Sequence, residues 1–235
     1  MKLEVKAVPF LYDSTFVILI PAIALALYAQ YKVRSTFNRY SKMPSGTGYT
    51  GARVAAELLR RQGISDVKVE PAQGMLSDHY DPRTKVLRLS PGVYESTSLA
   101  AIGVAAHEAG HAVQHRDRYA PLALRSAIVP VATIGTNAAW ILLIIGFVVG
   151  APRLIDLGIL LYLGYVAFAL VTLPVEFNAS NRAVALLQGQ GFVLPQEAQG
   201  VRAVLNAAAL TYVAAAAVAV FQLIRLFVLR RMSDD

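Results

Sequence analysis

Four stretches without a charged residue constrain this chain more than any other feature of its sequence. They cover residues 14–31, 126–152, 157–175 and 203–224. Each reaches the roughly 18 to 20 residues that a helix needs to cross about 30 Å of hydrocarbon. The alternative is a soluble core of four helices that are apolar on every side, which would be exceptional in a chain of 235 residues. The sequence therefore predicts a mainly α membrane protein with about four transmembrane helices.

The polar residues between these stretches divide the chain into five segments. We expect an N-terminal transmembrane anchor, a polar region, a transmembrane hairpin, a second short polar segment and a C-terminal transmembrane helix with its tail, at 1–33, 34–121, 122–175, 176–202 and 203–235. The first stretch also resembles a cleaved signal peptide. Glu4 and Asp13 interrupt its basic start, so an uncleaved anchor is the preferred interpretation.

The larger polar region has the pattern of a small α+β unit. Apolar residues recur at helical spacing over 50–62 and predict a helix. Two short strands are expected at 67–70 and 85–89, and residues 81–84 have the composition of a turn that closes a short β-hairpin. Ser98 is the expected N-cap of a long helix.

That long helix carries the sequence HEAGH at residues 107–111. Residues four apart lie on one face of a helix, so His107 and His111 can direct imidazole nitrogens to one metal ion. Glu108 projects beside that face, where a carboxylate can take a proton from water at the metal. A catalytic zinc site has three protein ligands and one open position. The pattern therefore requires a third ligand from elsewhere in the chain.

Three residues are candidates for this third ligand. On a continuous helix His115 lies two turns from His107, roughly 12 Å along the axis, which is too far to share an ion. Asp117 falls where the extended HExxHxxGxxH pattern places its last ligand, but Gln114 stands where that pattern needs a chain-turning glycine. Glu176 is the first charge after the third apolar stretch, and the transmembrane hairpin returns the chain to the side of the HExxH sequence. We expect Glu176 to be the third ligand.

The segment around Glu176 has further polar residues. Pro174 is expected to open a new helical segment just before it. The next polar positions are suited to hydrogen bonds that orient metal ligands, namely Asn178, Ser180, Asn181 and Arg182.

At this point the chain resembles the bacterial membrane-bound neutral zinc metallopeptidases of the YugP type. The matching segments are LSDHYDPRTKVLRLSPGVY, AAIGVAAHEAGHAVQH and LPVEFNASNRA. The resemblance implies a zincin-like catalytic region, a gluzincin-like zinc site of two histidines and a glutamate, and a bacterial plasma-membrane location. A more distant similarity is to HtpX-type membrane proteases, which have an ExxAD stretch where this chain has serine at the last position. Ser180 or Asn181 is expected to replace that aspartate by neutral hydrogen bonds.

The expected function is zinc-dependent hydrolysis of peptide bonds, with a role in membrane protein turnover or quality control. Zn²⁺ on His107, His111 and Glu176 would polarise the scissile carbonyl. Glu108 would carry the proton from water to the leaving amine. The edge strand of the hairpin can pair with an extended polypeptide substrate, and Tyr80, His79 or Arg182 can then stabilise the oxyanion. The alternative role for His79, together with Asp78, is to cap a turn.

Charge and composition bear on partners and on rival functions. The net charge of +7 is spread along the chain, so we expect the lipid bilayer and a polypeptide as partners and no nucleic acid. The excess of lysine and arginine on the side of the HExxH sequence favours a cytoplasmic catalytic face. A non-catalytic scaffold or assembly factor with a structural or vestigial metal site is the main alternative, but a chain with four histidines and no cysteine hardly builds a closed zinc site. A transporter would need more polar groups than Asn137 and a few threonines inside its spans. The sequence leaves the oligomeric state open.

Overall fold

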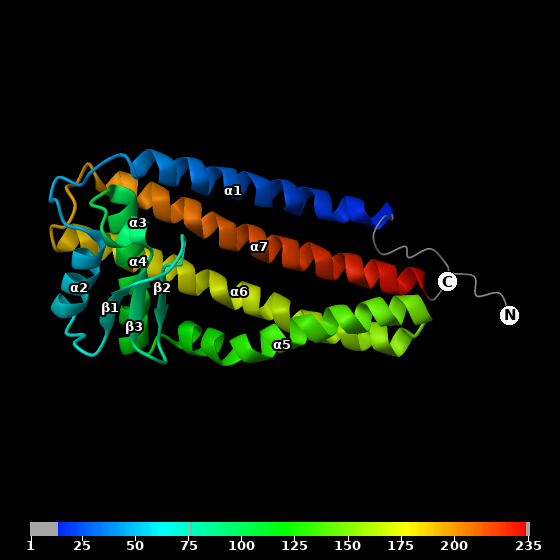
Figure 1. Cartoon of the computed structure of the whole chain (residues 1–235). Coiled ribbons are helices and arrows are strands. Elements are labelled where there is room, and N and C mark those ends of the chain that lie inside the picture. The colour runs from blue at the N-terminus through cyan, green and yellow to red at the C-terminus, as the bar shows by residue number, and fades with distance from the viewer. Residues whose placement is uncertain (1–13, 76, 234–235) are drawn as a thin grey trace. The chain divides into compact units, whose positions relative to one another are not determined.

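The computed structural model describes residues 14–75 and 77–233 (Figure 1). Its elements are, in chain order, η1 (Ser14–Leu19), α1 (Ile20–Tyr40), α2 (Gly51–Arg61), β1 (Lys68–Pro71), β2 (His79–Asp81), β3 (Val86–Leu89), α3 (Pro91–Tyr94), α4 (Leu99–Arg116), α5 (Ala120–Val149), α6 (Pro152–Gly189) and α7 (Ala198–Met232). Four helical segments in the described chain are long and apolar enough to cross a membrane: Ser14–Tyr40, Ala120–Val149, Pro152–Gly189 and Ala198–Met232. The predicted fold class, mainly α with four membrane-spanning helices and a small β part, is confirmed. Glu4 and Asp13, which favoured an anchor over a signal peptide, lie outside the described residues.

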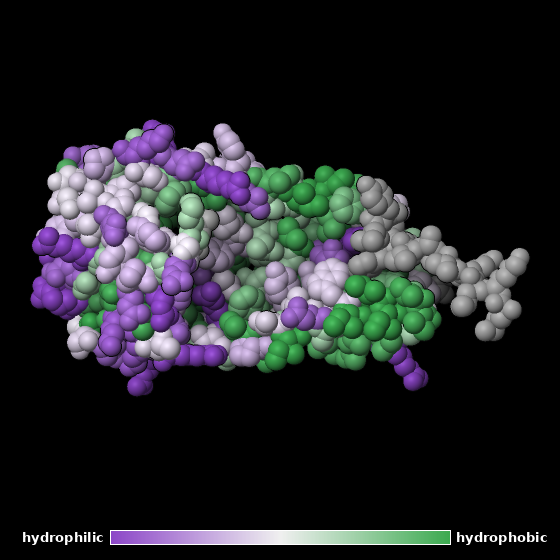
Figure 2. All heavy atoms as spheres, viewed as in Figure 1, coloured by the Kyte–Doolittle hydropathy of each residue, from purple (hydrophilic) through white to green (hydrophobic). Residues whose placement is uncertain are grey.

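The chain divides into two compact units. The first, here called the span unit, comprises Met1–Tyr28, Leu124–Thr172 and Tyr212–Asp235. Its described part consists of helical segments with apolar surfaces, which appear green in Figure 2. The predicted transmembrane hairpin is present, because α5 ends at Val149 and α6 begins at Pro152. Gly158 lets these two helices approach closely, since a Cβ there would lie 2.7 Å from the Leu143 Cγ atom.

The second unit, here called the site unit, comprises Ala29–Ala123 and Leu173–Thr211. It contains α2, the three strands, α3 and α4, together with the end of α1, the end of α6 and the start of α7. Hydrophilic residues are frequent on its visible surface (Figure 2). The predicted helix over 50–62 is α2, and the Thr50 side chain caps it by accepting a hydrogen bond from the Arg53 amide.

The three strands of the site unit form one sheet in the order β1-β3-β2. β2 and β3 form the predicted antiparallel hairpin, in which Tyr80 pairs with Leu87. Asp81 holds the turn, because its carboxylate accepts hydrogen bonds from the Arg83 amide and the Thr84 hydroxyl. β1 pairs with β3 in parallel, and β2 is left as an edge strand that also contacts α4.

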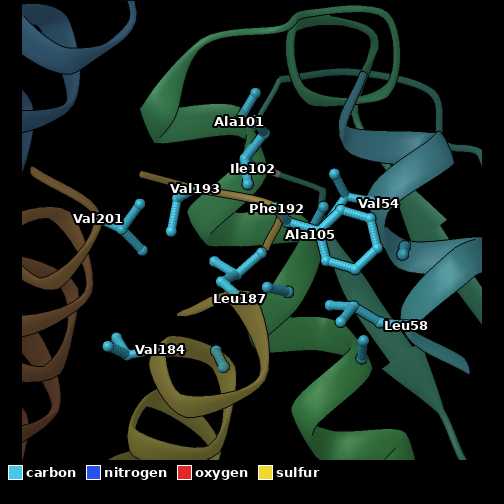
Figure 3. Close-up of a cluster of buried hydrophobic side chains, with 14 of the residues drawn as sticks. Val54, Leu58, Ala101, Ile102, Ala105, Val184, Leu187, Phe192, Val193 and Val201 are labelled. Carbon is cyan, nitrogen blue, oxygen red and sulfur yellow. The ribbon is translucent and has the colours of Figure 1, made fainter. Parts of the chain in front are cut away.

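The core of the site unit surrounds α4 (Figure 3). Side chains from α2, α4, α6 and the α6–α7 connection meet there, with Phe192 among the largest fully buried ones. Most residues of α4 are buried, and many of these buried residues are alanine or glycine. Small residues on every side of a helix let several neighbours approach it closely. Ser98 caps this helix by accepting from the Ala101 amide, as predicted.

One sequence prediction about α6 is wrong. Pro174 does not open a new helical segment, because α6 runs without a break from Pro152 to Gly189 and contains Pro174 in its interior. A proline inside a helix removes one backbone hydrogen bond, and a long apolar helix with packed neighbours tolerates this loss. Glu176 consequently lies on a helix that is continuous with the third apolar stretch. The second polar segment is divided between two helices, since α6 ends at Gly189 and α7 begins at Ala198.

Candidate metal centre

Two helices of the site unit bring three ligand-type side chains together. His107 and His111 lie one turn apart on α4, with ring centroids separated by 4.7 Å. Glu176 reaches them from α6, and its Oε2 atom lies 3.2 Å from the His107 Nε2 atom and 3.6 Å from the His111 Nε2 atom. One ligand atom from each residue lies within 4.8 Å of the other two. The chain thus joins two segments that are almost 70 residues apart in sequence into one possible metal site.

These separations suit a zinc ion. In a tetrahedral site with ligand distances of about 2.0–2.1 Å, neighbouring ligand atoms lie about 3.3 Å apart. The 3.2 and 3.6 Å separations in this cluster are close to that value. All three side chains are largely buried. Burial distinguishes this cluster from the groups of exposed acidic residues that are common on protein surfaces. The donor set of two imidazoles and one carboxylate fits zinc and leaves a fourth position open.

The two rival third ligands contact other groups. The Nδ1 atom of His115 lies 2.9 Å from the Tyr80 hydroxyl. The Asp117 carboxylate forms ion pairs with Arg182 and Arg116, and the hydrogen bond from Arg182 holds the pKa of Asp117 below its usual value. Neither residue belongs to the group of His107, His111 and Glu176, here called the metal-type cluster.

A glycine on α4 permits the close approach of α6. A Cβ atom at Gly110 would lie 2.7 Å from the backbone oxygen of Ala179, which is closer than real Cβ contacts. Gly110 directly precedes His111, and Ala179 lies three residues after Glu176. The two backbones therefore touch next to the ligands, and this contact sets the distance from which Glu176 reaches the histidines.

Each histidine is oriented by a neutral partner. The His107 Nδ1 atom lies 3.1 Å from the Ser180 hydroxyl, and the His111 Nδ1 atom lies 2.9 Å from the Gln114 side-chain oxygen. An amide oxygen only accepts hydrogen bonds, so His111 carries its proton on Nδ1. The Nε2 atoms of both rings face the Glu176 carboxylate, and each can bind a metal ion in its deprotonated form. Of the two residues expected to replace the aspartate of the distant relatives, Ser180 or Asn181, Ser180 lies within hydrogen-bond distance of His107, and its role in orienting a metal ligand stays a prediction.

Gln114 was missed as a contributor to this site. The sequence singled it out only because it is not the glycine of an extended zinc pattern. In the structure it is fully buried, and its amide nitrogen donates to the Val175 carbonyl at 2.8 Å and to the Asn178 side-chain oxygen at 2.9 Å. The one available signal was its spacing, because residue i+3 from His111 lies beside that ring on a helix.

The hydrogen-bond network continues to the surface from Gln114. The Asn178 oxygen also accepts from the Arg182 Nε atom at 2.8 Å, and Arg182 pairs with Asp117 at the end of α4. Arg182 is thereby fixed along one turn of α6 and tied to α4. These contacts connect the His111 ring to exposed charges through side chains that all have partners.

The charge around the cluster favours a cation. Burial of the His111 imidazole lowers its pKa, but the hydrogen bond with Glu176 and the negative charge of Glu108 more than offset this effect, so the pKa lies above the ordinary value of 6.5. Glu108 is buried as well. Within residues 14–75 and 77–233 its carboxylate has no hydrogen-bond or ion-pair partner, which leaves it available for a water molecule or a substrate.

The residues predicted to assist the reaction have contacts of their own. Burial raises the pKa of Tyr80 to about 12, so its hydroxyl stays protonated and can donate to His115. The His79 Nδ1 atom lies 2.7 Å from the Ser77 carbonyl oxygen, and Asp78 accepts hydrogen bonds from the Ser90 amide and hydroxyl. Among the described residues none of these groups is hydrogen-bonded to the metal-type cluster. Their roles in oxyanion stabilisation stay predictions.

Comparison with known proteins agrees with a zinc site in this chain. Residues 15–231 match the family described as "Putative neutral zinc metallopeptidase". The chain is 49% identical over 206 residues to "Putative membrane protease YugP" of Bacillus subtilis (strain 168), an alignment that covers 88% of this chain and 92% of that protein. No solved structure matches the chain. With nearly its whole length matched, this chain belongs to the neutral zinc metallopeptidase family, and its resemblance to the YugP type is confirmed.

Proposed function

We propose that this protein is an integral-membrane zinc-dependent endopeptidase. The observation that carries the proposal is the convergence of His107, His111 and Glu176 from two helices, with the buried carboxylate of Glu108 next to His107 on α4. These three residues would hold the ion. The chemistry that bound zinc supplies is polarisation of the scissile carbonyl and an increase in the acidity of the attacking water.

Glu108 would act as the general base and then as the general acid. It follows His107 on α4 and is close enough to influence the charge of His111. A buried carboxylate without a competing partner can accept the proton of the attacking water and deliver it to the leaving amine. Ser180 and Gln114 would hold the two imidazole rings in place through their Nδ1 atoms during this proton transfer.

The substrate we propose is an extended polypeptide. β2 is an edge strand and contacts α4, so its free edge can pair with a substrate backbone near the HExxH helix. Tyr80 on this strand, with a hydroxyl that stays protonated, is the first choice for an oxyanion donor, and His79 and Arg182 are the other two. Tyr80 would have to leave His115 to serve in this way.

The setting of the enzyme is part of the proposal. The five-segment division made from the sequence places the catalytic region at 34–121 and the third-ligand helix at 176–202, with bilayer-spanning segments around them. We propose a bacterial plasma-membrane protein whose catalytic face is cytoplasmic and whose substrates are membrane or membrane-proximal proteins that undergo turnover.

The test measures zinc content and proteolysis together. Full-length protein, purified in detergent, is analysed for bound zinc and for casein cleavage, and is compared with Glu176→Ala and Asp117→Ala. Asp117→Ala is the matched control, because it likewise removes one carboxylate. The Asp117 carboxylate lies at the end of α4 and is paired with Arg182. We expect one zinc per chain in the wild type and in Asp117→Ala, and loss of zinc and of chelator-sensitive cleavage in Glu176→Ala.

Two results would overturn the proposal in different ways. Zinc retained in Glu176→Ala would show that the third ligand lies elsewhere. Stoichiometric zinc in the wild type without cleavage of casein or of a membrane-protein mixture would favour the scaffold alternative, in which the metal is structural.

A further inference from the structure

A groove between α1 and α7 lies apart from the metal-type cluster. It belongs to the site unit and has a volume of about 600 Å³, within the range of about 300–1,000 Å³ typical of ligand sites. Its lining comes from one face of each helix. On α7 the small residues Ala203 and Ala207 are spaced by one turn and leave the space open, while on α1 the face carries Lys32 and Arg39.

The chemistry of this lining suits an anion with several oxygens. Lys32 and Arg39 are two turns apart on the same face of α1, about 10 Å along the axis, so their long side chains can converge on one ligand. Among the described residues neither forms an ion pair, and the Arg39 guanidinium lies 5.5 Å from the Tyr40 ring centroid. Ser35, Thr36 and Asn206 add neutral hydrogen-bond donors, and none of the described residues that line the groove is acidic.

The position of the groove along the two helices indicates where this anion comes from. Lys32 is the first charged residue after the uncharged stretch 14–31, and Arg202 is the last before the uncharged stretch 203–224. The groove therefore lies where the apolar spans of both helices end. Leu210 extends the lining from the polar groups towards the apolar part of α7. A ligand with a charged head and an apolar tail matches this gradient.

We infer that this groove binds the phosphate headgroup of an anionic phospholipid, with the phosphate between Lys32 and Arg39 and the acyl chains along α7. A single lysine at the end of a transmembrane helix commonly extends to the membrane surface without a partner. Here two cations share one helix face above a groove kept open by alanines, which is the arrangement of a lipid headgroup pocket between helices. The site requires no zinc and no peptidase activity.

The test compares two double variants that remove the same charge. Lys32→Gln/Arg39→Gln removes both groove cations, and Arg34→Gln/Lys42→Gln removes two exposed cations at the same end of α1 that do not line the groove. Full-length protein in detergent is titrated with dioctanoyl phosphatidylglycerol, and bound lipid is counted by native mass spectrometry. A cation near an anionic lipid contributes about fivefold in affinity, so we expect about 30-fold weaker binding for the groove variant and little change for the control.

Three further arms separate the possible sources of the phosphate. Dioctanoyl phosphatidylcholine should bind weakly, because its own ammonium neutralises the phosphate. Inorganic phosphate should not displace the lipid at equal concentration. Ala203→Leu, which keeps every charge but fills the groove, should also weaken phosphatidylglycerol binding. Equal losses in both double variants, equal binding of the two lipids, or displacement by free phosphate would each overturn the lipid assignment.

Discussion

Gln114→Leu is the substitution that most directly tests how the metal-type cluster is built. Leucine has a similar volume and is apolar, so it keeps the packing of this fully buried position. It removes the acceptor of the His111 Nδ1 proton and both hydrogen bonds that tie α4 to the Val175 and Asn178 groups of α6. The ligands themselves are unchanged. Any loss of zinc therefore measures the orientation of the His111 ring.

The expected magnitude follows from these contacts. Loss of a partner that orients a metal-bound histidine typically weakens metal binding 10- to 100-fold, which corresponds to about 1.4–2.8 kcal/mol. The same change leaves a buried imidazole N–H without an acceptor, at a cost of about 1–3 kcal/mol in the free energy of unfolding. Both effects should be visible, and the first requires the metal while the second does not.

The assay is competition for zinc against a colorimetric chelator, with thermal unfolding of the zinc-free protein measured in parallel. Gln188→Leu is the matched control, because Gln188 is exposed on α6. Gln114→Glu keeps an acceptor for His111 but cannot donate to α6, so it should bind zinc far better than Gln114→Leu. Because it also adds a buried negative charge, the zinc-free protein should be less stable than the wild type. Zinc affinity within about twofold of wild type in a folded Gln114→Leu protein would refute the argument.

Three other predictions address the base, the helix contact and the outer ion pair. Glu108→Gln should keep one zinc per chain but lose cleavage by about 10²- to 10⁴-fold, measured as zinc content and turnover on the same sample. Gly110→Ala should destabilise the protein by about 1–3 kcal/mol, because the added Cβ would lie 2.7 Å from a backbone oxygen. Gly164→Ala is the control and should not destabilise it, because a Cβ there would have no described atom within 4 Å. Equal melting temperatures for the two variants would contradict this prediction. Asp117→Asn should lower stability at neutral pH by less than about 1 kcal/mol, since the pair with Arg182 is partly exposed. The folded-state pKa of Asp117 is depressed below 3.8, so its contribution is present above that pH and lost as the pH falls further, and the melting temperatures of the two proteins should converge in acid.

Much of this fold follows from patterns that act over short distances. Uncharged stretches of about 18 or more residues predict spanning helices whatever their neighbours are. The β-hairpin was predictable because Asp81 and its turn residues specify it locally. Ser98 and the HExxH sequence were likewise visible, since a cap and an i, i+4 pair depend only on the helix that carries them. The expectation that Glu176 comes near the histidines needed one longer argument, the return of the chain through the hairpin of α5 and α6.

The features that could not be predicted depend on contacts between elements. Pro174 stays inside a helix because packing outweighs its local preference to start one. The parallel pairing of β1 with β3 cannot be seen in strands of four residues. Gln114 looks like any polar residue late in a helix until α6 is placed beside it. The groove between α1 and α7 likewise exists only once two faces from opposite ends of the chain meet.

Charge balance explains why the hydrogen-bond partners of both histidines are neutral. With zinc bound, the ion would contribute two positive charges, and Glu108 and Glu176 would contribute two negative ones. The sum is zero inside a largely buried site, where an unbalanced charge is costly. An aspartate at the position of Ser180 would add a third negative charge, whereas a hydroxyl at this distance can accept the His107 Nδ1 proton without one. Gln114 does the same for His111, and its donors also bind α6, so one buried amide both orients a ligand and joins the two helices that supply the site.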